Sequence, residues 1–374
     1  MADRLRIGVI GAGGVAQIEH IPNLLRLPGL FDLRGVADPS AMVRGSVAER
    51  HGLAVFPDAD ALLAEPLDAV VVASPDALHL EHVAAALEAG LHVFCEKPLT
   101  YAAADIALLA AARDTAGKVL QTGYMKRFDP SYEALLAMLP SQRGALRQIS
   151  VEVTDPDAGP FVKHHDWRAG NDLPADAGIR LRRLQAEQVG RAVPAVLDDI
   201  GVFGFCAAYA SSIVHDVNAV HGILDALGIG DGQIVGAAFF AGGLGGQGAV
   251  SLLDGSALWT MSHLTVPDLP HYSERITLTF EGSSIELEFP SPWLNHAPTR
   301  LTERRGRDGA LETRDIRTSY AEAFVEELKG FHRAVTAGEA VRNTAEAAGR
   351  DMKLLSGLAA WHANHSRRHK GEAA

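Results

Sequence analysis

The fold is decided by the first apolar stretch and the glycine-rich turn behind it, Leu5-Arg6-Ile7-Gly8-Val9-Ile10-Gly11-Ala12-Gly13-Gly14-Val15-Ala16. Residues 5–10 have the pattern of a buried strand, and a helix is predicted over 15–27. In the G-x-G-x-x-A turn between them, the first glycine permits a tight bend and the second lets the backbone approach a pyrophosphate. The small alanine lets the helix pack close to the strand, so that its first amides face the phosphates. This pattern predicts a dinucleotide-binding turn made of Gly11, Ala12, Gly13, Gly14 and Val15.

An acidic residue follows the second predicted strand, residues 31–37. Asp38 lies 22 positions beyond Ala16, where an acceptor for the ribose hydroxyls is expected. Its carboxylate would accept a hydrogen bond from the 2′-hydroxyl and repel a 2′-phosphate, which favours NAD over NADP. Asp38-Pro39-Ser40 is also a good start for a helix, and the two roles are compatible.

Strands and helices continue to alternate as far as residue 122, which predicts a doubly wound parallel sheet. We therefore expect an α/β Rossmann domain over residues 1–125. Ligands of such a domain bind outside the carboxyl ends of the strands. Two of these strands are expected to end at Ser74-Pro75 and at Glu96-Lys97-Pro98, so these residues are further candidates for the cofactor site.

Lys97 and His79 each have two interpretations. Pro98 disfavours a helical conformation at Lys97, which keeps the lysine extended at the end of its strand, within reach of a cofactor and a substrate. The alternative is an ordinary lysine of a surface loop. His79 lies early in the helix after Ser74-Pro75, where it either faces the nicotinamide ribose or serves as a capping or packing residue.

A different pattern begins after residue 125. Alternating apolar and polar residues over 148–154, 234–241, 249–253, 275–280 and 285–289 indicate antiparallel strands. They predict an α+β domain over 126–366 with an open, mainly antiparallel sheet that has one helical face and one free face. Helices are expected over 320–337 and 344–364, the last packing back on a sheet, before a polar tail over 367–374.

The candidate substrate-binding residues lie mostly in this second part. In a helix, Ser211, His215 and Asn218 would share one face, although an isolated histidine of this kind is often structural. The segment 155–209 is either a substrate lid, with Trp167 stacking on a sugar ring and His165 bonding its hydroxyls, or an ordinary packed insertion. The remaining candidates lie at the expected domain junction and are Tyr124, Lys126 and Arg127. For Lys126 and Arg127 the alternative is an ion pair at the surface.

Together these motifs resemble the glucose–fructose oxidoreductase, inositol dehydrogenase and rhizopine-catabolism oxidoreductases, the Gfo/Idh/MocA family. The resemblance rests on the glycine-rich turn, Asp38, Ser74-Pro75 with His79, Glu96-Lys97-Pro98, residues 123–130 and His215-Asp216. It implies that Lys97 lies between nicotinamide and substrate and that His215 exchanges the proton. It also implies a substrate pocket in the second domain and a homodimer or homotetramer formed through the open sheet face.

Two positions depart from the family pattern. Ser211 and Asn218 stand where the family often has aspartates. A serine hydroxyl orients an imidazole but does not stabilise an imidazolium by charge. This departure favours Lys97 over His215 as the main proton-transfer residue.

Composition excludes several other classes. The formal net charge of −12 argues against a protein that binds nucleic acid or an anionic membrane. Two cysteines make no disulfide framework, and their separation matches no zinc pattern. His362, His365 and His369 share a helical face, for which dipole contacts or a solvated helix end are favoured over a metal site. We find no signal-peptide pattern and expect no apolar run near the ~20 residues of a membrane span, which indicates a cytoplasmic protein.

The sequence thus predicts an NAD-dependent oxidoreductase that moves a hydride between a secondary hydroxyl of a sugar, glycoside or cyclitol and the nicotinamide. Lys97 and His215 are the predicted proton-transfer residues. One alternative is a glycoside-cleaving enzyme that retains NAD and oxidises its sugar only transiently. The other is a regulator that binds NAD and sugar without catalysis.

Overall fold

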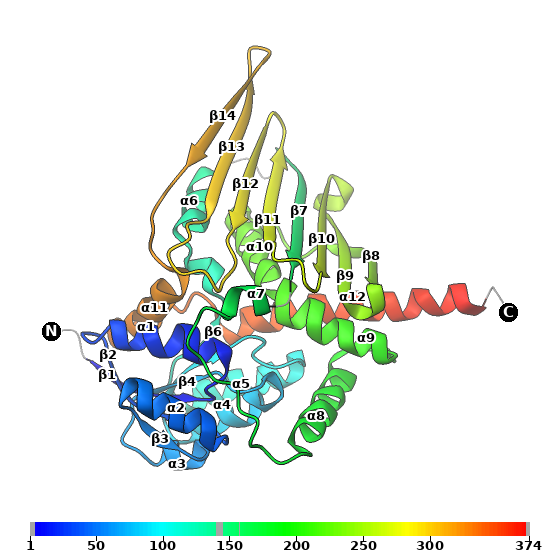
Figure 1. The fold of residues 1–374 in the computed structure, drawn as a ribbon. Coiled ribbons are helices and arrows are strands. Elements are labelled where there is room, and N and C mark those ends of the chain that lie inside the picture. Colours follow the sequence, from blue (N-terminus) through cyan, green and yellow to red (C-terminus); the bar gives the residue numbers. More distant parts are fainter. Residues whose placement is uncertain (1–3, 140–144, 157, 372–374) are drawn as a thin grey trace. The chain divides into compact units, whose positions relative to one another are not determined.

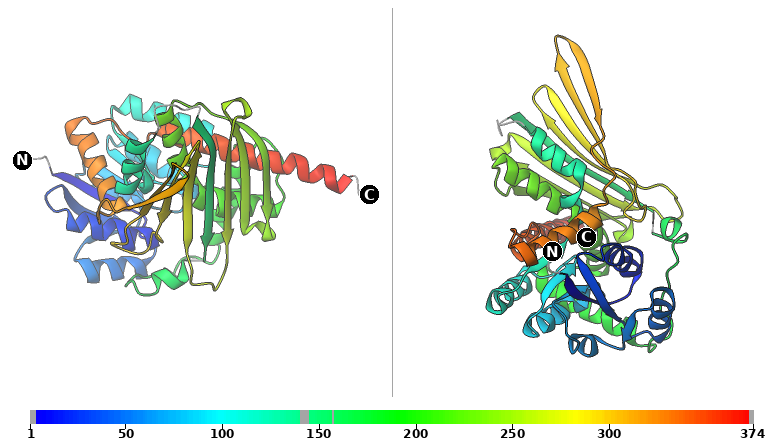
Figure 2. Two further views of the ribbon diagram at one scale, coloured as in Figure 1. Left: turned by 90° about the horizontal axis from the view of Figure 1, so that it is seen from above. Right: turned by 90° about the vertical axis from the view of Figure 1, so that its left-hand side faces the viewer.

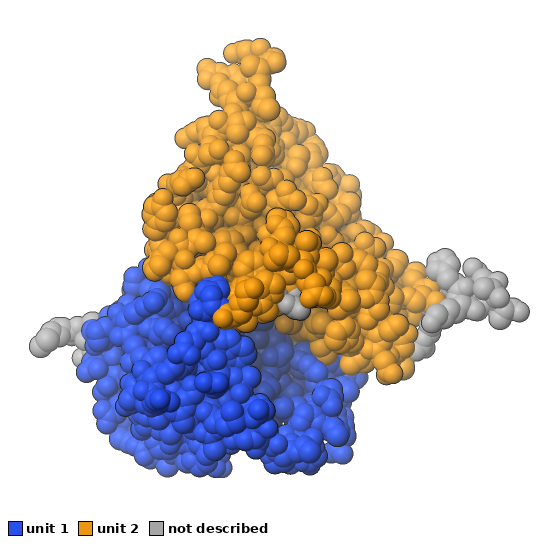
Figure 3. Space-filling view, in the orientation of Figure 1, with its two compact units in different colours: residues 1–124, 164–192, 324–350 blue, residues 125–163, 193–323, 351–374 orange. Residues whose placement is uncertain are grey.

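The computed structural model describes residues 4–139, 145–156 and 158–371, the stretch 367–371 by its helix alone. The chain divides into two compact units, coloured separately in Figure 3. Unit 1 comprises 1–124, 164–192 and 324–350, and unit 2 comprises 125–163, 193–323 and 351–374. The first segment of unit 1 ends at residue 124, and two later segments, 164–192 and 324–350, also belong to this unit.

Unit 1 is built on a six-stranded parallel sheet with the strand order β3-β2-β1-β4-β5-β6 (Figure 1). The strand β4 is entirely buried, because helices cover both faces of a parallel sheet and its alanine and valines have no polar side to expose. The strand order reverses between β1 and β4, the position where such sheets bind ligands. The strands are β1 (Leu5–Ile10), β2 (Phe31–Ala37), β3 (Ala54–Phe56), β4 (Ala69–Val72), β5 (His92–Glu96) and β6 (Leu120–Gly123).

The helices of unit 1 pack apolar side chains on this sheet. Leu328 and Phe331, from near the end of the chain, join the same core cluster as Phe31, Val71 and Phe94. This shared core explains why α11 belongs to unit 1. The helical elements are η1 (Ala16–His20), α1 (Ile21–Arg26), α2 (Ala41–His51), α3 (Ala59–Leu63), η2 (Asp76–Leu78), α4 (His79–Glu88), α5 (Ala103–Ala116), α8 (Ala177–Ala192) and α11 (Ala323–Ala337).

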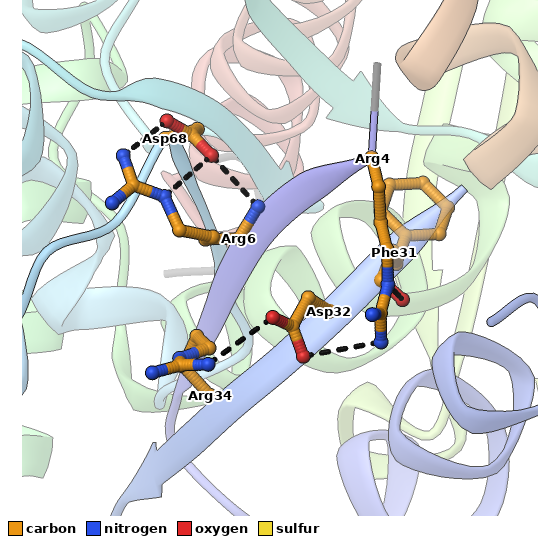
Figure 4. Close-up of polar contacts among 6 residues, drawn as sticks. All are labelled: Arg4, Arg6, Phe31, Asp32, Arg34 and Asp68. Atoms are coloured by element: carbon orange, nitrogen blue, oxygen red, sulfur yellow. Dashed lines mark hydrogen bonds and ion pairs between the residues drawn. The ribbon is translucent and has the colours of Figure 1, made fainter. Parts of the chain in front are cut away.

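Charged residues fill the amino ends of the first strands, away from the ligand edge (Figure 4). The guanidinium of Arg6 and its backbone N–H donate to the carboxylate of Asp68, and Arg4 and Arg34 both donate to Asp32. These pairs are partly exposed, so each contributes roughly 0–1 kcal/mol to stability.

Unit 2 contains an eight-stranded sheet with the order β14-β13-β12-β11-β7-β10-β9-β8. Only β7 and β10 pair in parallel among the described neighbours, so the prediction of a mainly antiparallel sheet is confirmed. Alternate residues of β7, including Ile149, Val151 and Val153, point into the core. The strands are β7 (Leu146–Asp155), β8 (Gln233–Phe240), β9 (Gly245–Leu252), β10 (Ala257–Thr265), β11 (Ser273–Phe280), β12 (Ser283–Phe289), β13 (Arg300–Arg307) and β14 (Ala310–Ile316).

Helices lie against one face of this sheet, α6 and α10 among them (Figures 1 and 2). The final helix runs to Gly371 and so enters the stretch that was expected to be a tail. The helical elements are η3 (Met125–Phe128), α6 (Pro130–Met138), α7 (Gly159–Val162), α9 (Asp199–Gly204), η5 (Phe205–Ile213), α10 (Val214–Leu227), η6 (Ala241–Gly243), η7 (Leu253–Gly255) and α12 (Ala345–Gly371).

One helical stretch corrects an expectation about membranes. The elements α9, η5 and α10 join into a continuous helix, Asp199–Leu227, that is long and apolar enough to cross a bilayer by length and composition. The expectation that no run approaches that length was therefore wrong. More than half of its most apolar window is buried in the fold, as in a core helix of a soluble protein, which passes the same test.

Candidate functional site

The predicted cofactor residues of unit 1 follow the carboxyl ends of its parallel strands, so they meet at one edge of the sheet. Gly11 follows β1, Asp38 follows β2, Ser74 follows β4 and Lys97 follows β5. Gly11 has a φ of 89°, and a Cβ at this position would lie 2.6 Å from the backbone of Ser74. The first turn therefore packs directly on the loop after β4, and only glycine fits there.

The carboxylate of Asp38 is held beside this turn. Its Oδ2 accepts a hydrogen bond from the backbone N–H of Ala12 at 2.9 Å, and its Oδ1 accepts from that of Ser40 at 2.9 Å. A Cβ added to Gly13 would have no described atom within 4 Å beyond the glycine's own chain neighbours, so the backbone is open to a close ligand. An open glycine backbone beside a fixed carboxylate fits a dinucleotide, with the phosphates on the amides and the ribose on Asp38.

A segment from far along the chain lies across this turn. We call residues 165–172 the strap. The backbone of Arg168 exchanges two hydrogen bonds with the amide of Gln17, at 2.8 and 3.0 Å, and the same amide donates to the carbonyl of Ala12. The ring of Trp167 lies 3.9 Å from the Cβ position of Gly14. His165 and Trp167 were predicted as sugar-binding residues of the second domain, but the structure assigns them to unit 1, with Trp167 beside the nucleotide turn.

His79 has a structural environment rather than an open one. It is fully buried, with Nδ1 at 2.7 Å from the carbonyl of Pro98 and Nε2 at 2.8 Å from the carbonyl of Ser74. Both ring nitrogens therefore face the backbone, and the packing interpretation replaces contact with a ribose. The ring connects the two loops that carry Ser74-Pro75 and Lys97-Pro98.

Lys97 directly follows a buried acid, Glu96. It is partly exposed, and its backbone N–H donates to Oε2 of Glu96 at 3.2 Å. Burial raises the pKa of Glu96, but the hydrogen bond from His20 at 2.7 Å and the charges of His20 and Lys97 outweigh it, so this pKa lies below its ordinary value. Glu96 is thus a buried anion that holds the backbone of the strand end beneath the lysine. Burial and the repulsion of Glu96 raise the pKa of Glu327 well above its ordinary value.

In unit 2, Lys126 is committed to two carboxylates and is not an exposed donor. Its ammonium donates to Oδ1 of Asp216 at 2.9 Å and to Glu274, and it lies 5.0 Å from the ring centre of Phe289. Glu274 also accepts from the hydroxyl of Tyr272 at 2.8 Å. The side chain of Lys126 is 4% exposed and is held in a buried ion pair, whereas the alternative interpretation of Lys126 was an ion pair at the surface.

The electrostatics of this cluster act in opposite directions on its members. Burial and the repulsion of Glu274 raise the pKa of Asp216 well above its ordinary value, against the opposing effect of Lys126. Burial lowers the pKa of Lys126, but its two acidic partners raise it further, so the lysine remains charged. The ammonium is therefore the group that offsets the burial of its acidic partners.

The predicted face of Ser211, His215 and Asn218 is not regular. Ser211 lies in the π-helical segment η5, whose longer turn changes the register before α10 begins. Ser211 is exposed and His215 is half-buried, whereas Asn218 is fully buried and donates to Oδ2 of Asp351 at 2.8 Å. Asn218 is thus a core residue that connects α10 to α12, and its contact with substrate stays a prediction.

Two further candidates are also engaged within the fold. Tyr124 is fully buried, and its backbone carbonyl accepts from the amide of Asn343 at 3.0 Å. The guanidinium of Arg127 donates to the carbonyl of Asn218 at 3.3 Å and lies over the ring of Tyr132. Arg127 remains half-buried.

Unit 2 also has a cavity of about 490 Å³ over β7–β10, lined in part by Trp361, Met261 and Gln247. None of the predicted substrate-binding residues lines it. Among the described residues, no group of three His, Cys, Asp or Glu side chains is arranged to hold a metal ion.

Sequence reasoning missed the residues that support the site from a distance. Gln17 and Asp172 fix the strap, Glu327 lies near Glu96, and Glu274 pairs with Lys126. Only Gln17 had a local signal, its place in the first turn after the glycines.

Comparison with known proteins tests the predicted resemblance. Residues 5–124 match the Gfo/Idh/MocA family model, described as the oxidoreductase family with an NAD-binding Rossmann fold. The nucleotide-binding domain of this chain is thus similar to that of the Gfo/Idh/MocA oxidoreductases. The predicted resemblance and the Rossmann fold of this domain are confirmed.

Curated proteins match parts of this chain. The chain is 39% identical over 133 residues to inositol 2-dehydrogenase 3 of Saccharopolyspora erythraea, which is 35% of this chain and 39% of the relative. It is 39% identical over 137 residues to inositol 2-dehydrogenase of Rubrobacter xylanophilus, covering 36% of this chain and 39% of that protein. The match thus spans about two fifths of the length of these curated relatives.

Solved structures share the fold of nearly the whole chain. UDP-N-acetylglucosamine 3-dehydrogenase GnnA from Acidithiobacillus ferrooxidans has a TM-score of 0.69 at 20% identity, covering 97% of this chain and 99% of that one. KijD10, a 3-ketoreductase from Actinomadura kijaniata solved with NADP and TDP-benzene, has a TM-score of 0.71 at 22% identity, with 96% and 98% covered. At these identities the likeness shows the fold alone.

Proposed function

We propose that this protein is an NAD-dependent oxidoreductase that acts on a secondary hydroxyl of a sugar, glycoside or cyclitol. The observation that carries the proposal is the glycine-rich turn hydrogen-bonded to Asp38, in a domain that matches the Gfo/Idh/MocA family model. The matched inositol 2-dehydrogenases, whose named substrate is a cyclitol, support this substrate class.

The cofactor preference follows from Asp38. Its carboxylate is held by two backbone amides on the carboxyl side of β2, where it is a fixed acceptor for ribose hydroxyls. A 2′-phosphate would meet this negative charge, which favours NAD. When bound, NAD supplies the acceptor for the hydride.

Lys97 and His215 are the proposed proton-transfer residues. Lys97 is partly exposed at the ligand edge of the parallel sheet of unit 1, and Glu96 accepts a hydrogen bond from its backbone N–H. His215 is half-buried in the first turn of α10. Because the neighbouring position in the helix is Ser211 and not an acid, we assign the larger share of proton transfer to Lys97.

Replacing Lys97 by methionine tests this assignment. The Lys97→Met variant should lose turnover of sugars, cyclitols or glycosides while its affinity for NADH remains within about threefold, because methionine keeps the length of the side chain without its charge. Lys118→Met is the matched control, since Lys118 precedes β6 at the opposite, amino edge of the sheet. Unchanged NADH formation by Lys97→Met would exclude the lysine from the chemistry.

The strap favours one alternative strongly enough to test it in the same assay. Its bonds to Gln17 and the contact of Trp167 with the nucleotide turn would slow release of a bound dinucleotide. An enzyme that retains NAD in this way suits transient oxidation of a glycoside followed by cleavage. Cleaved glycoside without net NADH would favour this alternative, and net NADH would favour the dehydrogenase.

A further inference from the structure

A second carboxylate stands at the start of α2, next to the ribose-binding position of Asp38. Asp172 of the strap accepts a hydrogen bond from the hydroxyl of Ser40 and another from the backbone N–H of Met42 at 3.0 Å. These hydrogen bonds lower the pKa of Asp172, so its carboxylate is charged at neutral pH.

Ser40 connects the two acids. Its backbone N–H donates to Asp38 at 2.9 Å, and its hydroxyl donates to Asp172. Asp38 and Asp172 therefore lie on two sides of one residue, just after β2. A negative group on the ribose 2′-oxygen would have to approach both carboxylates.

The strap holds Asp172 in this position. At Arg168 its backbone is bonded to Gln17, and a Cβ at Gly170 would lie 2.6 Å from the hydroxyl of Ser40. The backbone of the strap thus rests directly on the start of α2, which is eleven residues long. Although the carboxylate of Asp172 is exposed, it belongs to a segment whose backbone is hydrogen-bonded to Gln17 and packed against Ser40.

Without Asp172, the same place would suit a phosphate. The hydroxyl of Ser40 and the backbone N–H of Met42 are donors that a phosphate accepts from readily. Arg44 adds a cation, whose guanidinium donates to the carbonyls of Asp38 at 2.7 Å and Pro39 at 3.0 Å. In this chain Asp172 uses both of these donors and adds a negative charge.

We propose that Asp172 is a specificity-determining residue that excludes a 2′-phosphate, and hence NADP, from the nucleotide site. The inference rests on the proposed function, because it requires that the glycine-rich turn binds a nicotinamide dinucleotide. It adds to the role of Asp38, because the discrimination comes from a segment 132 positions away from Ser40 in the sequence.

The test compares binding of NADH and NADPH to the full chain by nicotinamide fluorescence. Asp172→Asn keeps the shape and an acceptor oxygen but removes the charge. It should tighten NADPH binding by about tenfold, the effect of removing one partly screened charge close to a phosphate. NADH affinity should change by less than about threefold, because the 2′-hydroxyl carries no charge.

Two controls separate this effect from others. Asp176→Asn removes the same charge from an exposed residue just beyond the strap, and the ratio of NADPH to NADH affinity should not change. Raising the salt concentration to about 1 M should reduce the discrimination of the wild-type protein, because the repulsion is screened.

The outcomes distinguish the two proposals. If Asp172→Asn changes NADH and NADPH binding equally, Asp172 only holds the strap and this inference is overturned. If the affinity ratio is unchanged while the wild type binds NADH, this inference alone fails. If the wild type binds neither NADH nor NADPH, both the proposed function and this inference are overturned.

Discussion

Replacing Lys126 by methionine should destabilise the protein by about 3–5 kcal/mol at pH 7. The side chains of Lys126, Asp216 and Glu274 are 4%, 0% and 4% exposed, so water cannot replace the lost ammonium. Methionine has a similar length and fits against the ring of Phe289. The variant therefore tests charge more than packing.

The magnitude follows from the burial of the cluster. In the wild type the ammonium of Lys126 opposes the burial and repulsion that raise the pKa of Asp216. Without the lysine, the buried carboxylates have lost their cation. Breaking a buried ion pair by removing one partner typically costs roughly 3–5 kcal/mol, which gives the expected loss.

The sign of the pH dependence is a stricter criterion. Removing Lys126 takes away an interaction that lowers the pKa of Asp216, so the folded variant binds protons more tightly than the folded wild type, and its stability relative to the wild type rises as the pH falls. The loss at pH 5 should therefore be smaller than the loss at pH 7.

Urea unfolding followed by circular dichroism at pH 5 and pH 7 measures both values. Lys163→Met, at an exposed lysine of the same unit, is the matched control and should change stability by less than about 0.5 kcal/mol. A loss below about 1 kcal/mol at pH 7, or a larger loss at pH 5 than at pH 7, would refute the buried cluster. A folded variant with normal stability but impaired turnover would instead support the original prediction of a substrate contact.

Two further predictions concern other parts of the chain. Gly11→Ala should lower the melting temperature and abolish NADH binding, because the added Cβ would lie 2.6 Å from the backbone of Ser74. Gly13→Ala should fold normally, since its Cβ meets no described atom within 4 Å. Equal melting temperatures of the two variants would contradict this prediction. Burial lowers the pKa of His263 to about 4, so between about pH 6.5 and pH 4 the imidazole is protonated in the unfolded chain but not in the folded one. The free energy of unfolding should therefore fall by about 3 kcal/mol over this pH range. His263→Gln should flatten this part of the stability curve, and a slope equal to that of the wild type would show that another group is responsible.

The parallel sheet of the first domain could be predicted because its signals are local. The bend at Gly11, the acid after β2 and the buried run of β4 each occupy a few neighbouring residues. A parallel sheet then brings their carboxyl ends together without further information. The second sheet was predicted in kind but not in pairing, since the alternation of β7 and β10 does not show that these two strands run in parallel.

Helix geometry explains one error. The predicted face of Ser211, His215 and Asn218 assumed a regular α-helix, but η5 is π-helical and shifts the register before α10. The apolar composition of this stretch favours a helix of either kind. The π-helical segment packs against β9 and β10, and these contacts are not contained in the sequence pattern.

The remaining errors share one physical cause, which is that the partner of a charged or polar side chain often lies far away in the sequence. Lys126 and Arg127 look like a pair of exposed cations, yet the acids that pair with Lys126 are 90 and 148 positions distant. The entropy cost of closing a loop grows only slowly with its length, so sequence separation barely restricts which acid meets which cation. The same argument applies to the strap, whose contacts with Gln17 and Ser40 span more than a hundred positions. A motif therefore identifies the nucleotide turn, whereas the residues that tune its selectivity have to be found in the folded structure.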